Sequence, residues 1–296
     1  MVDGFFGPNM AMEIVSLPGN WINSDPITPS SIQGKAVLLD FWSYSCSRCI
    51  RRIRMLNRAW EERGNDPIIF IGIHTPRFSF EQHMENLSSA VRRLGIEYPV
   101  MNDPVGENWK KFGNNEIPMS IFISPGKALE IPAGMLERYR RIAGMEMRPF
   151  FMTGEVLAGK QWNPCIGSIR IFSRESCDSY YDPGNHREGI IYLGGDWNQE
   201  IEYIESPGNS GHISIRFNAR EADAVMDGSG HAEVFYLGEI LDPEIAGKDI
   251  IFKRGRSFVS VNGPRSYSLL TLEKYMPGEL KIVPFPGIRI YSFEFG

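Results

Sequence analysis

The chain is short of cysteine, histidine and long hydrophobic runs. Its 296 residues include 4 cysteines and 5 histidines, and so few cysteines exclude a fold built on a network of disulfides. No apolar stretch approaches the roughly 20 residues that cross a bilayer. The formal net charge of −5 argues against nucleic acid as the main partner. An ordinary globular protein remains, with 42% hydrophobic and 23% charged residues.

A secretory leader is also missing from the first residues. The opening MVDGFFGPNMAMEI has neither the basic segment nor the continuous apolar segment that is typical of a signal peptide. Taken alone, this favours a cytoplasmic location.

The length predicts about two domains, and the sequence pattern changes near residue 155. We expect a first domain over residues 1–155, where AVLLDFW (36–42) and PIIFIGIHT (67–75) are typical of strands buried on both faces. Helical spacing of apolar residues follows each strand, over 49–63 and over 79–95, the second helix opened by a capping box of Ser79 and Gln82. Alternating strands and helices indicate an α/β sheet covered by helices.

The second domain, expected over residues 156–296, has a different pattern. HISIRFNA and IYSFEFG alternate apolar and polar residues, and turn sequences such as SPGN, DGSG and NGP separate the short segments. Alternation with period two, broken by glycine and proline, predicts an all-β sandwich.

Two cysteines, Cys46 and Cys49, stand two residues apart directly after the first predicted strand. A dithiol switch needs one thiol held as thiolate and a second close enough to resolve a mixed disulfide. At the start of a helix, unpaired backbone N–H groups would favour the thiolate of Cys46, and Arg48 adds a positive charge. The pattern therefore predicts a redox-active pair.

Arginine is frequent in the helix that follows the pair, at positions 48, 51, 52, 54 and 58. These side chains could steer an acidic partner. Charged residues on a helix are more often simply solvated, and beyond Arg48 we favour that interpretation.

Other interpretations of the cysteine pair stay open. A zinc site would need two more ligands, but Cys165 and Cys177 lie in the second domain and the histidines are scattered, so we expect no metal and no cofactor. A thiol peroxidase would use Cys46 against hydroperoxides. The threonine motif that usually precedes the cysteine of such an enzyme is absent, because Ser43 and Tyr44 occupy those positions. A binding module would need the disulfide only for structure. Cys165 and Cys177 either pair or are two small buried residues.

The residues around the pair resemble a known superfamily. VLLDFWSYSCSRC is similar to the thioredoxin superfamily in its TlpA-like branch. WINSDPITPSSIQGKAVLLDFWSYSC, GIHTPRF, IYLGGDWNQEIEY and IRIYSFEFG resemble the soluble C-terminal region of DipZ-type thiol–disulfide proteins. This resemblance implies a thioredoxin fold followed by a β-sandwich similar to a carbohydrate-binding module. It also implies a thiol–disulfide oxidoreductase outside the cytoplasm, fed by a membrane-embedded or thioredoxin-type electron donor.

The resemblance implies a role for individual residues. Cys46 would attack a protein disulfide and Cys49 would resolve the mixed disulfide. Asp40 would be the buried acid that exchanges the proton of Cys49, since burial raises the pKa of a carboxyl group. Pro118 would be a cis-proline, preceded by Ile117, where DipZ relatives tend to carry tryptophan.

Further residues support the site or suggest a second one. Trp42 belongs to the aromatic pair before the cysteines, and Arg48 lies between them. Arg54 stands where the superfamily often has proline. In the second domain, Trp197 and Tyr203 could line a flat surface for a sugar ring or a partner, although fold alone does not establish such a function. Docking of a partner or positioning of the redox pair is the alternative that we favour.

Overall fold

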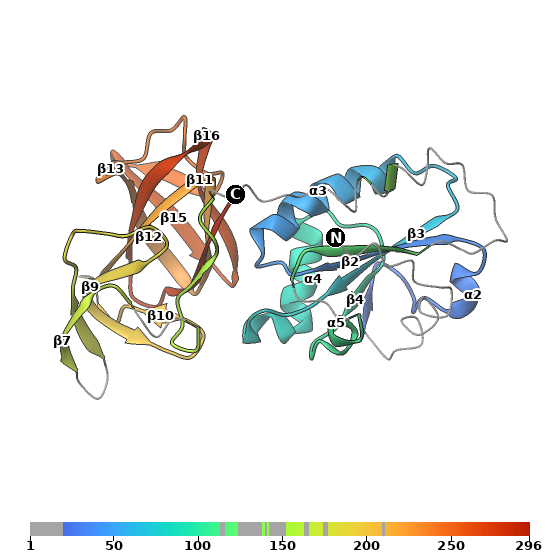
Figure 1. Ribbon diagram of the computed structural model, residues 1–296, viewed down its shortest axis with the longest axis horizontal. Coiled ribbons are helices and arrows are strands. Elements are labelled where there is room, and N and C mark those ends of the chain that lie inside the picture. The colour runs from blue at the N-terminus through green and yellow to red at the C-terminus, as the bar shows by residue number, and fades with distance from the viewer. Residues whose placement is uncertain are drawn as a thin grey trace. The chain divides into compact units, whose positions relative to one another are not determined.

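The computed structural model describes residues 20–112, 116–123, 138–139, 141, 152–162, 166–173, 177–208 and 211–296. The chain divides into two compact units, residues 1–147 and 148–296 (Figure 1). This division precedes the expected boundary after residue 155. Met152 already packs in the core of the second unit, and the backbone N–H of Thr153 donates to the carbonyl of Asn218.

A five-stranded sheet organises the first unit, in the order β1-β4-β3-β2-β5. The strands are β1 (Trp21–Ile22), β2 (Ala36–Trp42), β3 (Ile68–His74), β4 (Val100–Asn102) and β5 (Met119–Ile123). Strands β2, β3 and β4 run parallel, while β1 and β5 join the edges antiparallel. All seven residues of β2 are buried, as its apolar sequence predicts for an inner parallel strand.

Short and long helices accompany this sheet. They are α2 (Pro29–Ile32), α3 (Ser47–Glu61), α4 (Met84–Arg93), α5 (Glu107–Lys111) and the 3₁₀ helix η1 (Ser79–Gln82). The expected continuous helix from Ser79, with its capping box, is wrong: η1 ends at Gln82, the backbone of the next residue, His83, is extended, and no side chain caps η1. The consecutive residues Phe80 and Glu81 are both buried, which a helix exposed on one face does not favour.

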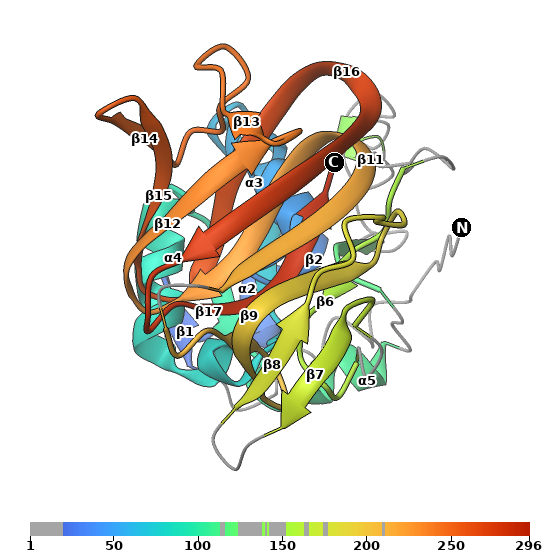
Figure 2. The ribbon, with the colours of Figure 1, turned by 90° about the vertical axis from the view of Figure 1, so that its left-hand side faces the viewer.

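The second unit is all β, as expected. Its strands are β6 (Val156–Leu157), β7 (Ile169–Ser173), β8 (Asp178–Tyr181), β9 (Ile191–Gln199), β10 (Ile204–Glu205), β11 (His212–Asp227), β12 (Ser229–Tyr236), β13 (Glu239–Ile240), β14 (Ile250–Lys253), β15 (Arg256–Asn262), β16 (Arg265–Pro284) and β17 (Arg289–Phe295). Strand β11 pairs with β9 through residues 212–215 and with β17 through residues 222–227. The sheet therefore folds back on itself around one apolar core (Figure 2).

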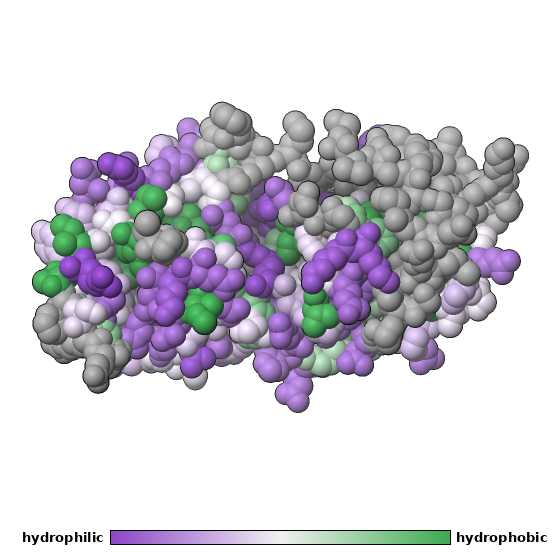
Figure 3. Space-filling model, turned by 60° about the horizontal axis from the view of Figure 1, so that its bottom comes forward, coloured by the Kyte–Doolittle hydropathy of each residue, from purple (hydrophilic) through white to green (hydrophobic). Residues whose placement is uncertain are grey.

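The surface is mostly hydrophilic on the face that Figure 3 shows, where hydrophobic side chains stand in small separate spots. Single exposed apolar residues of this kind are normal for soluble proteins and indicate no site by themselves. Among the described residues, no helix has the length and apolar character to cross a membrane.

Candidate redox site

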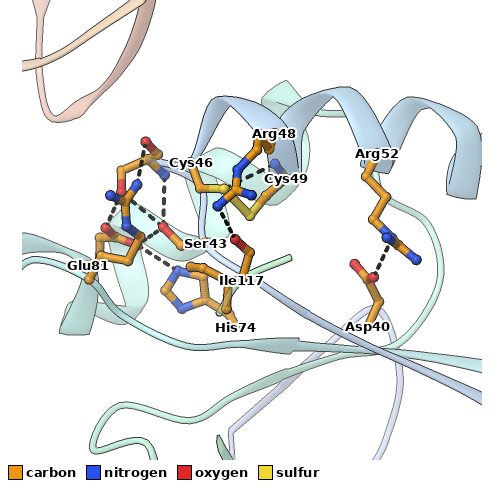
Figure 4. Close-up of a disulfide and its surroundings, with 11 residues drawn as sticks. Asp40, Ser43, Cys46, Arg48, Cys49, Arg52, His74, Glu81 and Ile117 are labelled. Carbon is orange, nitrogen blue, oxygen red and sulfur yellow. Dashed lines mark hydrogen bonds and ion pairs between the residues drawn. A yellow bond between two sulfur atoms is a disulfide. The ribbon is translucent and has the colours of Figure 1, made fainter. Parts of the chain in front are cut away.

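Cys46 and Cys49 form a disulfide where β2 turns into α3, with their Cα atoms 5.2 Å apart (Figure 4). Cys46 is the N-cap of α3, and the backbone N–H of Cys49 donates to its sulfur over 3.1 Å. The strand-to-helix position predicted for the pair is confirmed. An N–H group in the first turn of the helix faces the sulfur that we expect to carry negative charge.

The disulfide form buries both cysteines, with Cys46 3% exposed and Cys49 fully buried. In this form neither sulfur is exposed to solvent to any large extent. Beside the disulfide, the Arg48 guanidinium donates from Nη2 to the carbonyl oxygen of Ile117 over 3.0 Å, and Figure 4 shows this contact reaching from α3 to Ile117. The Ile117–Pro118 peptide bond is cis, as the resemblance implies.

Asp40 and Arg52 form a buried ion pair below α3. Arg52 Nε lies 3.0 Å from Asp40 Oδ1, and the hydroxyl of Ser120 donates to the same oxygen. Nearby, burial raises the pKa of Tyr98 well above its usual range, and the charge of Asp40 adds to that shift while Arg52 opposes it. The Tyr98 phenol therefore keeps its proton.

The sequence interpretation of Arg52 as a solvated arginine was wrong, although it holds for Arg54 and Arg58, which are exposed. One signal could have found Arg52. It stands three residues after Cys49 and one before Ile53, in the stripe that the helical period buries. A charge inside such a stripe needs a buried partner.

A second buried carboxylate, Glu81, lies under the turn that leads to Cys46. The Ser43 hydroxyl donates to Glu81 Oε2 over 2.6 Å, and the Ser45 hydroxyl donates to Oε1. His74 Nε2 lies 3.3 Å from Oε2. Glu81 thus ties together the two serines that precede Cys46, and no pattern in the sequence pointed to it.

Trp42 supports this polar cluster as well as the sheet. Its ring meets the imidazole of His74 edge-on, with 5.3 Å between ring centroids, while Tyr44 stacks on the same imidazole at 5.2 Å. The other ring nitrogen of His74, Nδ1, lies 3.4 Å from the side-chain oxygen of Asn102. Trp42 and Tyr44 therefore hold His74 in place, and His74 in turn faces Glu81.

In the second unit, the expected aromatic surface does not form around Trp197. This side chain is fully buried in the core, and its indole N–H donates to the carbonyl of Gly194 over 3.0 Å. A sugar contact at Trp197 is therefore wrong. Tyr203 is half-buried, with its ring 5.3 Å from Tyr291 and the Arg289 guanidinium 5.2 Å above it.

No group of three or more histidine, cysteine or acidic side chains is arranged to hold a metal ion in the part of the chain that the structure describes. Cys165 lies outside the described residues. Both alternatives for Cys165 and Cys177, a disulfide or two small buried residues, therefore stay predictions.

Comparison with known proteins covers both units. Residues 165–296 match the family described as thioredoxin like C-terminal domain, which lies in the all-β unit. Protein DipZ of Mycobacterium tuberculosis is 23% identical over 310 residues, covering 93% of this chain and 41% of DipZ. The chain is similar to DipZ along nearly its whole length. It spans less than half the length of that relative.

Two further proteins are similar to parts of this chain. NHL repeat-containing protein 2 of Bos taurus is 31% identical over 232 residues, covering 70% of this chain and 31% of that protein. Among solved structures, a thiol-disulfide isomerase from Corynebacterium glutamicum is 16% identical with a TM-score of 0.36, covering 43% of this chain and 92% of that one. The first unit has the strand order and the cysteine position expected of a thioredoxin fold.

Proposed function

We propose that the protein exchanges electrons with protein disulfides through Cys46 and Cys49. The observation that carries this proposal is the disulfide at the N-terminus of α3, next to the Ile117–Pro118 peptide. A disulfide between residues three apart at a helix start constrains little of the chain, because the loop that it closes is short. That argues against a merely structural role.

Cys46 is the nucleophile in this proposal. The N–H of Cys49 faces its sulfur, and both the helix terminus and Arg48 favour negative charge there. The thiolate attacks a substrate disulfide, one substrate sulfur leaves as thiolate, and a mixed disulfide forms at Cys46. Cys49 then attacks the sulfur of Cys46, the second substrate sulfur leaves, and two electrons have passed to the substrate.

We propose the reducing direction and an upstream donor. Each substrate disulfide reduced leaves Cys46 and Cys49 oxidised, so continued turnover requires a donor dithiol, either membrane-embedded or thioredoxin-like. DipZ is longer than this chain, and a donor domain in cis or a separate protein would both satisfy the chemistry. Because the resemblance to DipZ-type proteins implies a membrane-embedded donor that serves the extracytoplasmic side, we propose an extracytoplasmic site of action.

The test is to trap the mixed disulfide. Cys49→Ser leaves Cys46 able to attack and removes the thiol that releases the product. In a background with Cys165 and Cys177 replaced by serine, we expect an adduct with a disulfide-containing protein such as insulin, reversed by dithiothreitol. Cys46→Ser is the matched control and should give none.

Recovery of no adduct with Cys49→Ser would count heavily against the proposal. Two other outcomes identify the alternatives. Consumption of hydroperoxide by the wild-type protein without protein-disulfide exchange would indicate a thiol peroxidase. A Cys46–Cys49 bond that no dithiol reduces in the folded protein would indicate a structural disulfide and a binding module.

A further inference from the structure

Five arginines lie on α3, and Arg52 differs from the other four. Arg54 and Arg58 are exposed, and Arg48 and Arg51 are half-buried. Arg52 is buried on the face that carries Cys49. A guanidinium is placed in a protein interior at high cost unless a charged partner compensates it, so the reason for its position must lie in what it touches.

That partner is Asp40. The two groups are 3.0 Å apart, with almost no exposure on either side chain, and Figure 4 shows the guanidinium directed at the carboxylate from α3. Burial alone would favour the neutral acid, whereas a permanent positive charge at contact distance favours the carboxylate. Because arginine does not lose its proton in proteins, its effect persists at every pH of interest.

The other groups around Asp40 either favour its charged form as well or carry no charge. The hydroxyl of Ser120, on β5, donates to the carboxylate, which again favours the charged form. Tyr98, which follows α4 in the chain, is also near Asp40; because its pKa is raised, it keeps its proton and carries no charge. Arg48 and Arg51 add positive charge on α3 itself. No anion faces Asp40 among these residues.

Resting on the function proposed above, we propose that Arg52 locks Asp40 as a permanent anion, so that Asp40 does not carry the proton of Cys49 during exchange. Arg52 is then a positioning residue that acts through Asp40. The ion pair places a nearly compensated charge near Cys49 rather than a lone acid. This replaces the role that the family resemblance implied for Asp40.

The exchange step remains balanced without Asp40. Cys49 gives its proton to solvent, its thiolate attacks the sulfur of Cys46, and the bond between Cys46 and the substrate breaks. The substrate sulfur takes the electron pair and then a proton from solvent. The protein gains one disulfide and the substrate becomes a dithiol.

The first experiment titrates Asp40 directly and needs no substrate. Reduced full-length protein labelled with ¹³C in the aspartate carboxyl groups is followed by NMR from pH 3 to pH 9, and the Asp40 signal is assigned by its loss in Asp40→Asn. We expect no titration of Asp40 between pH 6 and pH 8 in the wild type or in Arg52→Lys, which keeps the charge. In Arg52→Met the midpoint should rise by about two pH units or more.

The second experiment measures the step at Cys49, in the background that lacks Cys165 and Cys177. Reduced protein is mixed with 5,5′-dithiobis(2-nitrobenzoate), and release of the second thionitrobenzoate reports the attack of Cys49 on the adduct at Cys46. We expect one ionisation in the pH profile of the wild type and a second in Arg52→Met. That second ionisation should disappear in Arg52→Met/Asp40→Asn. The exposed Arg54→Met is the matched control and should behave as the wild type.

Titration of Asp40 between pH 6 and pH 8 in the wild type would overturn the proposal, as would an unchanged midpoint in folded Arg52→Met. If Arg52→Met does not fold, the wild-type and Arg52→Lys titrations decide. Failure of the redox function is distinguishable, because it would remove exchange with protein substrates while leaving the titration of Asp40 as expected.

Discussion

The pairs that flank the disulfide of the first unit and the Glu233–Arg256 pair of the second unit are buried to different degrees. In the first unit, both members of each buried pair are inside: the side chains of Arg52 and Asp40 are 4% and 3% exposed, and those of His74 and Glu81 are fully buried. In the second unit, the buried Glu233 pairs with Arg256, whose side chain is 55% exposed. Charge that is completely removed from water costs stability, and the first unit bears that cost on both sides of its disulfide.

The difference assigns separate tasks to the two units. Asp40 and Arg52 lie on the α3 side of Cys49, and Glu81 lies beneath the turn before Cys46. The second unit has a continuous apolar core; the arginine of its Glu233–Arg256 pair faces solvent, whereas His186 and Asp182 pair largely inside. We therefore expect changes in the first unit to alter redox chemistry, and changes in the second to alter stability. The following predictions, from the largest effect to the smallest, test that division.

Loss of the nucleophile should have the largest effect. Cys46→Ser should reduce exchange with protein disulfides by about 10³-fold or more, because no other group in this account supplies the attacking sulfur. The unfolding transition of the second unit should not change. An insulin-reduction assay measures the exchange and a thermal melt measures the unfolding transition. Exchange that persists in Cys46→Ser would show that Cys46 is not the nucleophile.

Truncation of Trp197 should lower the stability of the second unit and leave the reactivity of Cys46 unchanged. Trp197→Ala leaves a large cavity in the core of the second unit and should lower its free energy of unfolding by about 3–5 kcal/mol. The rate of reaction of Cys46 should stay within twofold of the wild type while both units are folded. Denaturant unfolding and alkylation kinetics measure these quantities. A large fall in the Cys46 rate under native conditions would show that the second unit takes part in the chemistry.

Two buried glutamates, Glu81 of the first unit and Glu233 of the second, provide a matched pair. Glu81→Gln breaks a fully buried set of interactions with Ser43, Ser45 and His74, and should destabilise the first unit by about 3 kcal/mol. Glu233→Gln removes a pair whose arginine faces water, and should cost about 1 kcal/mol or less. Equal losses in denaturant unfolding would mean that the contrast in burial has no energetic consequence. Glu81→Gln should also slow alkylation of Cys46, because the turn before it loses its anchor.

Acid should weaken one cluster in the second unit. Burial alone would raise the pKa of Asp182, but hydrogen bonds from His186, the Gly184 backbone and His212 outweigh it and lower the pKa to about 2. A depressed carboxyl pKa stabilises the fold above the unfolded-state value of about 3.9 and loses that contribution as the pH falls towards 2. Asp182→Asn should therefore be about 1 kcal/mol less stable than the wild type at pH 5.

The difference in free energy of unfolding between the wild type and Asp182→Asn should disappear as the pH falls from 5 to 2, as measured by urea unfolding at each pH. A gap that stays constant over that range would contradict the assigned hydrogen bonds. The redox midpoint of Cys46 and Cys49, compared at pH 7, should be the same in both.

The smallest effect is expected at Arg48. Arg48→Ala removes the contact with the Ile117 carbonyl and the positive charge that favours the thiolate of Cys46, and should slow reduction by dithiothreitol about threefold at pH 7. Arg51→Ala, on the same helix, is the control and should change the rate less. A faster reaction in Arg48→Ala would contradict the role of its charge at Cys46.

Patterns of single residues predicted much of this architecture. The apolar run of β2, the helical stripe of α3 and the alternation in β11 and β17 each led to the observed element, because period and apolarity are local properties. The cysteines followed from their place between a strand and a helix. The helix break at His83 was missed, since the burial of Phe80 and Glu81 depends on contacts distant in the chain.

The polar partners of the site were not predictable in the same way. Arg52 lies 12 positions from Asp40, and Glu81 lies 38 from Ser43, so their pairing depends on how α3 and η1 pack against the sheet. An aromatic residue such as Trp197 likewise looks the same in sequence whether it faces a ligand or a core. Tertiary packing decides both cases.

The most direct test of the redox account is the reduction potential of the Cys46–Cys49 couple. Protein is equilibrated in dithiothreitol or glutathione buffers of known ratio, quenched by alkylation, and the peptide that contains both cysteines is measured by mass spectrometry. We predict a reversible two-electron transition near about −270 mV or lower, as a reductase requires. A midpoint near about −120 mV would reverse the direction of electron flow, and a bond that does not titrate reversibly would contradict the central claim.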